Sequence, residues 1–473
     1  MDSTKEYLDN EAQDKKLSSG VNFSSLAESK VLTSLIWGNN VKQDIFERWS
    51  QGLIFSNEKE PCALLQYSGG PCAVITAVQA YLLKELIFCA QCDTNWRKPE
   101  KNELNQHLTD SLLSIYINVS TEKTKYLLFY EPNDDAENAE SNIENNSDES
   151  ESSSKRAKLD YDAFIDKIKA YKFSTLNELK EKLATKIDSY KKNYGVLCFL
   201  YSLILTKGLD EIERELEESG ESLIDPLHGH GSQCLTNLML CGIATSNVFD
   251  GDKSLEGLSL KGIPNQSCIG FLTIMEYLRY CEVGWNLKNP KYPIWILASE
   301  THLTVFFSQV NTSIIKIIIL KETSLVQKNE SSRQTAIQNF KSFDPDDNGF
   351  VKSEDLESLM ASLDLLTDKE YVDCVKLQLD TENLGIITQV AFLNEFYPES
   401  EQQIIPNEFN VYHYNGLARS NQENEVHFSE GKAKLIDFTD QPSLDLNSIK
   451  SCLQTKWPTI EIEWLDSRIP SLN

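Results

Sequence analysis

The sequence is short of basic residues and of long apolar runs, and each shortage removes a class of function. Lys and Arg number 45 against 72 Asp and Glu in 473 residues, a net charge of −27. Nucleic acids and anionic membrane surfaces are bound by clustered Lys and Arg, so neither is expected as the main partner. The longest apolar run, Val196 to Leu205, is far shorter than the roughly 20 residues that span a bilayer, so no membrane span is expected.

Regularly spaced cysteines and an apolar leader are also missing. The eleven cysteines are an odd number and lie mostly in apolar stretches, which predicts reduced, buried thiols in an intracellular protein. The polar start Met1–Lys5 lacks the apolar region of a secretory signal. The expected location is therefore the cytoplasm and, because of a basic cluster at residues 155–158, the nucleus.

Hydrophobic residues at 40% and aromatics at 10% are enough for at least one sizeable core. Residues 1–30 are polar and are expected to form a flexible tail. Residues 131–154 carry nine acidic and no basic side chains amid Ser and Asn, so residues 131–158 are expected to be a disordered linker.

Local signals predict helices in the middle of the chain and strands after them. Thr175 and Glu178 form a possible capping box before an apolar face spaced 3, 4, 4. Ser232 and Gly242 bracket an apolar run and predict a capped, buried helix. Three runs rich in β-branched and aromatic residues predict adjacent strands: Tyr292–Leu297, Leu303–Phe307 and Ile314–Leu320. Helices followed by strands favour an α+β fold.

The segment from Gln66 to Val74, QYSGGPCAV, is the most informative in the chain. Two glycines allow a tight turn, Pro71 suits the first helical position, and Cys72 then falls in the first turn of a helix that is apolar nearly all round to Cys89. Free N–H groups and the helix dipole at that position favour a thiolate, so Cys72 is a candidate nucleophile. The alternative is that Cys72 is only a small apolar residue at a helix start.

A cysteine nucleophile needs a base, and the chain has six histidines. His302 opens a predicted strand and is the best placed of them. His228 and His230 lie in a Gly-rich loop and could be structural or contact a substrate. Gln66 is placed to donate an amide N–H to a developing oxyanion.

The segments around Cys72 and around His302, together with Leu223–Gln233, Asn247–Asp252, Tyr412–Leu417 and the end of the chain, resemble the MINDY family of papain-like deubiquitinases and its EF-hand-bearing member. The resemblance covers most of the chain from about residue 31. It implies a papain-like fold without a cofactor, with Cys72 as nucleophile, His302 as general base and acid, and Gln66 as oxyanion donor. It also implies cleavage of the lysine-linked polyubiquitin chains that mark proteins for the proteasome. A third member of the catalytic triad cannot be assigned from the sequence; Asn415 is a candidate.

Residues 344–355 follow the pattern of a calcium-binding EF-hand loop at positions one, three, five and six, and a degenerate copy begins at Asp380. Lys352 at position nine and a shorter carboxylate at position twelve weaken a cation site. We therefore expect a structural EF-hand-like module without calcium regulation, whose two loops are held together by the pairing of Val351 with Ile387. The candidate ligands are Asp344, Asp346, Asn348 and Asp355.

One compact basic cluster, Lys155, Arg156 and Lys158, resembles a nuclear import signal that importin could bind, although a chance solvated charge run is equally compatible with it. The expected organisation is a catalytic domain over residues 31–330, an EF-hand-like insertion over 331–398, and the rest of the catalytic domain over 399–473. The alternative function is a catalytically silent ubiquitin-binding or EF-hand adaptor, in which Cys72 and His302 never meet.

Overall fold

The structure is a computed structural model, and its contacts divide the chain into two units. One comprises residues 1–312 and 408–473, and the other residues 313–407. The structure describes residues 20–56, 59–89, 95–120, 124–131, 160–216, 222–255, 258–309, 330–345, 348–363, 384–397, 408–435, 448–466 and 469–473, with residues 365, 367, 372, 375, 376, 379 and 380.

Several expectations lie outside these residues: the acidic linker beyond residue 131, the basic cluster at 155–158, and the strand at 314–320. The expected tail over residues 1–30 is wrong for its last part. Phe23 is fully buried in the main core, and strand β1 (Val21–Asn22) pairs with β3 (Ile168–Phe173). One buried aromatic ring ties this short segment to the domain.

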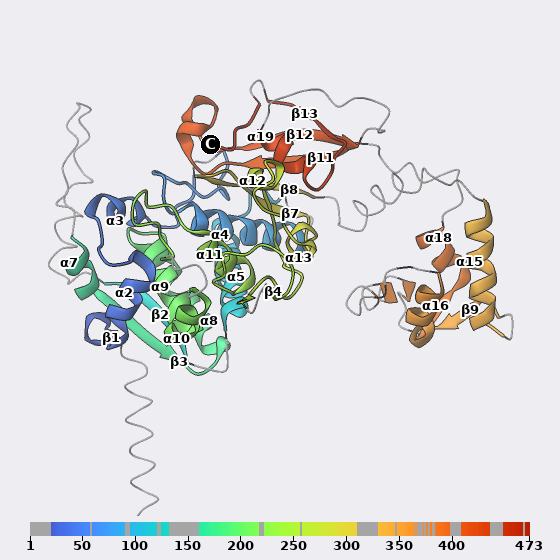
Figure 1. Cartoon of the computed structure of the whole chain (residues 1–473), viewed down its shortest axis with the longest axis horizontal. Helices are drawn as coiled ribbons and strands as arrows, with labels where there is room; N and C mark the ends of the chain where they lie inside the picture. The colour runs from blue at the N-terminus through green and yellow to red at the C-terminus, as the bar shows by residue number, and fades with distance from the viewer. Residues whose placement is uncertain are drawn as a thin grey trace, which may run out of the picture. The chain divides into compact units, whose positions relative to one another are not determined.

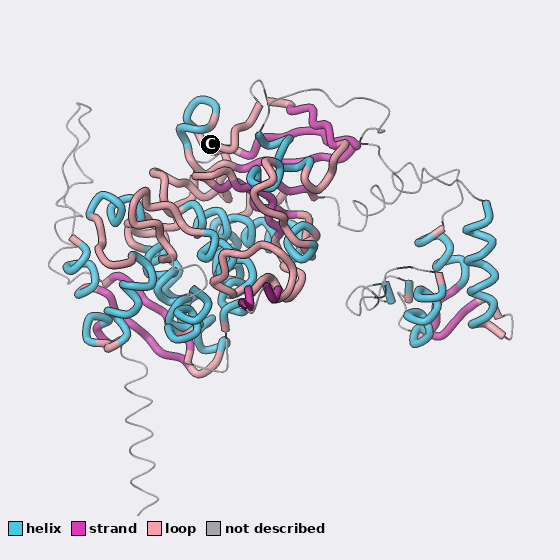
Figure 2. The backbone as a smooth tube through the Cα atoms, viewed as in Figure 1, coloured by secondary structure: helices cyan, strands magenta, loops and turns pink. Residues whose placement is uncertain are grey.

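Helices and a sheet are segregated in the larger unit, as an α+β fold requires (Figures 1 and 2). A small sheet of order β1-β3-β2, which the sequence did not predict, lies among the helices. Its third strand is β2 (Lys125–Tyr130). The helices are α2 (Glu28–Trp37), α3 (Gln43–Trp49), α4 (Cys72–Lys84), α5 (Lys101–Val119), α7 (Tyr161–Asp166), α8 (Leu176–Tyr190), α9 (Gly195–Lys207), α10 (Leu209–Leu216), α11 (Gln233–Cys241), α12 (Ile274–Tyr277), α13 (Trp285–Lys288) and α19 (Ser448–Gln454).

The caps predicted from the sequence are confirmed. Thr175 and Glu178 make the capping box of α8. The Ser232 side chain accepts a hydrogen bond from the Leu235 N–H at the start of α11, and Gly242 ends that helix with φ of 74°. These signals act within a few residues of each other, so the local sequence is sufficient to specify them.

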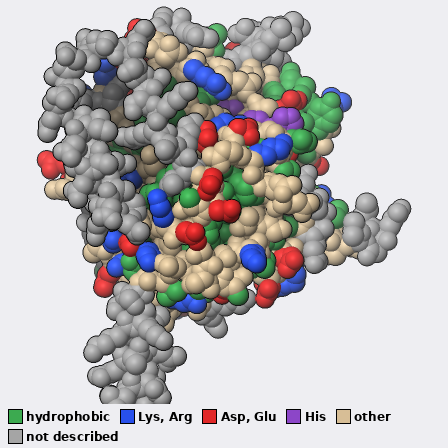
Figure 3. Space-filling model, turned by 90° about the vertical axis from the view of Figure 1, so that its left-hand side faces the viewer, with side chains coloured by type: hydrophobic (Ala, Val, Ile, Leu, Met, Phe, Trp, Pro, Cys, Tyr) green, Lys and Arg blue, Asp and Glu red, His purple; other side chains and the backbone are tan. Residues whose placement is uncertain are grey.

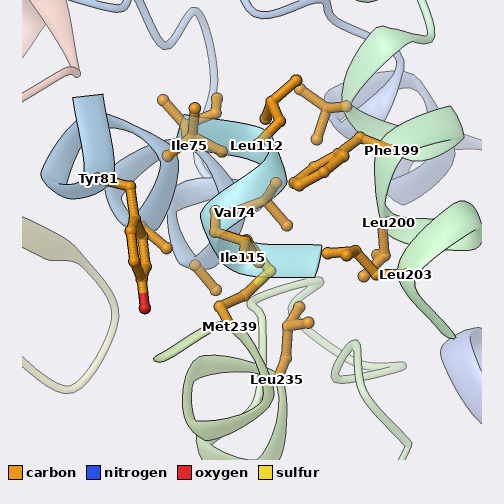
Figure 4. Packing of buried hydrophobic residues seen from close by; sticks show 14 of the residues in the cluster. Val74, Ile75, Tyr81, Leu112, Ile115, Phe199, Leu200, Leu203, Leu235 and Met239 are labelled. Carbon is orange, nitrogen blue, oxygen red and sulfur yellow. The ribbon is translucent and has the colours of Figure 1, made fainter. Parts of the chain in front are cut away.

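Helix α4 forms the centre of the core. Its side chains pack with those of α5, α9 and α11, as Val74, Leu112, Phe199 and Leu235 show in Figure 4. The stretch from Cys72 to Cys89, which continues α4 through a π-helical turn, η2 (Glu85–Cys89), is long and apolar enough to cross a membrane by length and composition alone. Within the described structure 72% of it is buried, which is typical of a core helix.

The main sheet has the order β13-β12-β11-β8-β7-β6, and all of its pairs are antiparallel except β6 with β7. Two of the predicted strands are confirmed as β7 and β8. Strands β8 and β11 are neighbours in space, although the second unit separates them in the sequence. The strands are β6 (Gly270–Thr273), β7 (Ile294–Ala298), β8 (Leu303–Ser308), β11 (Glu408–Tyr414), β12 (Phe428–Leu435) and β13 (Ile460–Trp464), and a separate hairpin holds β4 (Lys253–Leu255) and β5 (Leu258–Leu260).

The second unit has its own small core. Two of its loops are joined by a short antiparallel ladder in which Val351 and Ile387 are paired, and both side chains are buried. This is the pairing that the sequence led us to expect. Its elements are α15 (Glu330–Phe343), β9 (Phe350–Lys352), η3 (Ser353–Asp355), α16 (Leu356–Ser362), β10 (Ile386–Thr388) and α18 (Gln389–Phe396).

Candidate active site

The turn before Cys72 can only be made with glycine at position 70. Gly70 has φ of +136°, a conformation that L side chains rarely adopt, and a Cβ there would lie 3.0 Å from Trp49 Nε1 and 3.1 Å from the Gly229 carbonyl oxygen. Pro71 then caps α4, and Cys72 is its first residue, so the helix begins one residue later than expected. The turn places the Cys72 thiol at the helix N-terminus, with 3% of the residue exposed.

Burial outweighs the helix N-terminus in setting the pKa of Cys72. Loss of solvent raises the pKa of this thiol to about 11, against the smaller lowering effect of the N–H groups of Leu303, Ala73 and Cys72 itself. The N–H groups at the start of α4 favour the thiolate, as expected from the sequence, but by themselves they do not bring the pKa of Cys72 down to neutral pH. The thiol contacts the Gly70 carbonyl oxygen at 3.8 Å, and its ionisation requires a base.

His302 is held by Asn415. His302 Nε2 lies 2.8 Å from Asn415 Oδ1, and the ring is buried with 6% of the residue exposed. The same amide oxygen accepts the Leu417 N–H at 3.0 Å, which fixes it as the oxygen. An amide oxygen only accepts, so Nε2 carries the proton and Nδ1 is the basic atom. Burial lowers the pKa of His302, while the bond to Asn415 acts to raise it.

The start of β8 lies along the first turns of α4, so residues that closely follow Cys72 and His302 are in contact. Thr76, one turn after Cys72, donates its hydroxyl to the Leu303 carbonyl oxygen at 3.1 Å. The Leu303 N–H, the next backbone group after His302, is among those that favour the Cys72 thiolate. A buried thiol and an oriented imidazole with a free Nδ1 are the components of a cysteine nucleophile and its base.

Gln66 also lies at the site. Its backbone N–H donates to the Gly416 carbonyl oxygen at 2.8 Å, beside the Asn415 segment. Its side-chain Nε2 donates to the Ser68 carbonyl oxygen at 2.7 Å, so the amide points into its own loop. An amide nitrogen carries two N–H groups, and the second is not used by that bond.

The His228–His230 loop packs against the turn before Cys72. Arg48 donates to the carbonyl oxygens of His228 at 2.7 Å and Gly69 at 3.3 Å, and so joins the two loops. A charge on His230 would lower the pKa of His302, another sign that the loop lies near the site. On the face in Figure 3, histidine side chains lie beside hydrophobic ones, and acidic and basic side chains are interspersed.

Residues at the end of the chain belong to the site and were missed as contributors. The Ser471 carbonyl oxygen accepts from Asn415 Nδ2 at 3.2 Å, and Asn473 Oδ1 accepts from Ser299 Oγ at 2.6 Å. No motif in the sequence connects these residues with His302. The sequence feature that comes nearest to such a motif is Ser299, three residues before His302, whose side chain makes the contact to Asn473.

No group of three or more His, Cys, Asp or Glu side chains in the described part of the chain is arranged to hold a metal ion. Of the calcium candidates, Asp346 lies outside the described residues. The Asp344 carboxylate accepts the backbone N–H groups of Asn348 at 3.0 Å and Gly349 at 2.7 Å, so both of its oxygens already have partners. Asp355 lies in η3, the turn before α16.

Comparisons with known proteins identify the family to which the chain is similar. A family model described as deubiquitinating enzyme MINDY-3/4, conserved domain, matches residues 33–345. Ubiquitin carboxyl-terminal hydrolase MINDY-3 is 43% identical over 453 residues in Xenopus tropicalis and 43% over 458 residues in Homo sapiens, covering 94% of this chain and 99% of each relative. A homologue in Drosophila melanogaster is 36% identical over 489 residues, with 96% and 84% coverage. No solved structure matches the chain at a significant level.

Proposed function

The chain belongs to the MINDY family of deubiquitinating enzymes, which are cysteine-type ubiquitin carboxyl-terminal hydrolases, and on that premise we propose that Cys72, His302 and Asn415 carry out its chemistry. The observation that carries the proposal is the bond between His302 Nε2 and Asn415 Oδ1. It leaves Nδ1 as the basic atom of the ring, and burial raises the pKa of the Cys72 thiol, so that the thiol needs a base.

The reaction follows from these positions. Nδ1 takes the Cys72 proton as the sulfur attacks the carbonyl carbon at the ubiquitin C-terminus, and the carbonyl oxygen becomes an oxyanion. Collapse breaks the bond to the lysine amine, which leaves with the proton from Nδ1, and a thioester remains. Water, deprotonated by Nδ1, then releases ubiquitin and the thiol. Gln66 supplies its second N–H to the oxyanion.

The substrates are lysine-linked polyubiquitin chains of the kind that direct proteins to the proteasome. The acidic chain is compatible with a neutral or basic partner. A nucleophile on a central helix and a base immediately before a sheet strand support a papain-like arrangement, and the two paired loops of the second unit support an EF-hand-like module with a structural role.

The direct test is a ubiquitin derivative with a C-terminal electrophile. The wild type should form a covalent adduct that Cys72→Ala abolishes, and His302→Ala should lose cleavage of lysine-linked tetraubiquitin. Gln66→Ala should be milder, at roughly 10²- to 10³-fold in kcat if it supplies one oxyanion donor. Cys234→Ala, at another buried cysteine, is the matched control. Undiminished cleavage by His302→Ala would reject the assignment, and binding of ubiquitin without any adduct would favour the silent adaptor.

The protein is also proposed to enter the nucleus through importin, which would recognise Lys155, Arg156 and Lys158. The cluster is the support for this, and the rest of the surrounding segment is acidic. Replacing all three by Ser in a fluorescent fusion should shift the protein to the cytoplasm. An unchanged distribution would reject the import signal.

A further inference from the structure

The last residues of the chain are joined to both sides of His302. The Ser471 carbonyl oxygen accepts a hydrogen bond from Asn415 Nδ2 at 3.2 Å, and Asn473 Oδ1 accepts one from Ser299 Oγ at 2.6 Å. Between them, Leu472 has no exposed surface. The segment is therefore anchored by one buried side chain and makes one polar contact on each side of it.

We propose that Ser471–Asn473 is a positioning element that holds His302 in the protonation state and orientation needed for catalysis. The proposal rests on the catalytic role of His302 proposed above and adds residues that touch neither substrate nor reacting atoms.

The first contact acts on the proton of His302. A side-chain amide has an oxygen that only accepts and a nitrogen that only donates. The Ser471 carbonyl can only accept, so Asn415 must turn its nitrogen to that side and its oxygen to His302. Rotating the amide by 180° would place the nitrogen against Nε2 and favour the proton on Nδ1, which removes the base.

The Leu417 N–H supports the same orientation, because it donates to Asn415 Oδ1. Losing the Ser471 contact should therefore weaken the preference of the Asn415 amide for the orientation with its oxygen toward His302, without abolishing it. This predicts a moderate loss of rate in contrast to the complete loss expected for His302→Ala.

The second contact acts on the backbone of His302. Ser299 Oγ accepts the His302 N–H at 3.0 Å and closes the turn between β7 and β8. A hydroxyl has one proton to donate, and within this turn it can also reach the His302 carbonyl oxygen at 3.2 Å. The shorter contact to Asn473 holds the hydroxyl rotor in one orientation.

The test is Leu472→Asp in the full chain, with Ile469→Asp as the matched control, since Ile469 is in the same segment and 52% exposed. A charge at the buried position should undock the segment. We expect kcat to fall by about tenfold with KM unchanged, because the two hydrogen bonds that hold His302 and its partner are lost together. The control should match the wild type.

Two measurements separate positioning from unfolding. Titration with the electrophilic ubiquitin counts competent thiols, and the kcat per titrated site should still be reduced. Nitrogen-15 spectra of labelled histidine, assigned with His302→Gln, should show the Nε2–H form of His302 in the wild type and a mixture with the Nδ1–H form in the variant.

A second variant avoids the buried position. Asn473 is exposed, so Asn473→Ala should leave the melting temperature unchanged and lower kcat by about two- to fivefold. If both variants keep the wild-type kcat per site and spectrum while His302→Ala is inactive, the positioning role is wrong and the catalytic assignment stands. Increased activity on undocking would mean that the segment inhibits the enzyme, which also overturns the proposal. If His302→Ala is active, the proposed function itself fails.

Discussion

Replacing Asn415 by Ala removes the partner of His302 and leaves the thiol and the base in place. The lost bond is 2.8 Å long and buried. It is charge-assisted once His302 has taken the thiol proton, and hydrogen bonds to charged groups contribute about 1.5–3 kcal/mol. At about 1.4 kcal/mol per tenfold, kcat/KM for tetraubiquitin should fall by roughly 10- to 100-fold.

The pH dependence of kcat/KM should shift in a direction that depends on the replacement at Asn415. The bond to Asn415 raises the pKa of His302, against burial, which lowers it. If the active form pairs a thiol with a neutral imidazole, the acidic limb of kcat/KM follows His302. Asn415→Ala should shift that limb to lower pH, whereas Asn415→Asp, which keeps an acceptor and adds a negative charge, should shift it to higher pH.

The assay is initial-rate cleavage between pH 5 and 9, normalised to the sites titrated by the electrophilic ubiquitin. Asn421→Ala is a useful neighbour control, because its amide donates to backbone carbonyls of the same segment and does not contact His302. A profile of Asn415→Ala identical to that of the wild type would refute the argument that this bond orients the base.

Three further predictions concern stability and the second unit. His413 is buried, and burial lowers its pKa to about 3. The unfolded chain therefore takes up this proton at a higher pH than the folded chain, so the free energy of unfolding should fall as the pH drops below about 6.5. Urea unfolding at pH 7.5 and at pH 5 should show a smaller loss of stability for His413→Phe than for the wild type. Ser232→Ala removes the cap of α11 and should lower the free energy of unfolding by about 1 kcal/mol in the same assay, whereas no change would mean that the cap is not needed. Micromolar calcium should change neither melting temperature nor activity, because Lys352 adds a positive charge to the loop and Asp355 is shorter than the Glu that normally clamps the ion; calorimetric binding coupled to a change in rate would contradict this.

The sequence was sufficient wherever the determining contacts are local. The Gly-Gly-Pro turn predicted a cysteine at a helix start, and the caps of α8 and α11 are as expected, because each signal spans only a few residues. The pairing of Val351 with Ile387 followed from the loop pattern in the same way.

Contacts across the fold could not be predicted in this way. The bond from His302 to Asn415 joins residues that the second unit separates in the sequence. Strand β1 is only two residues long, too short to show a strand pattern in the sequence. The effect of burial on the pKa of Cys72 could not be predicted for a related reason: a helix start can be recognised in the sequence, but the amount of solvent removed from the sulfur depends on everything packed around it.

The placement of Ser471 next to Asn415 has a consequence for the newly made protein. Translation delivers Cys72 early, and the helices around it can fold while the ribosome still holds the rest of the chain. The base arrives later with β8, its partner Asn415 after the second unit, and Ser471, which holds that partner, later still. A chain that stops before Ser471 would thus carry a protonated, buried thiol and a base whose partner lacks one of its contacts.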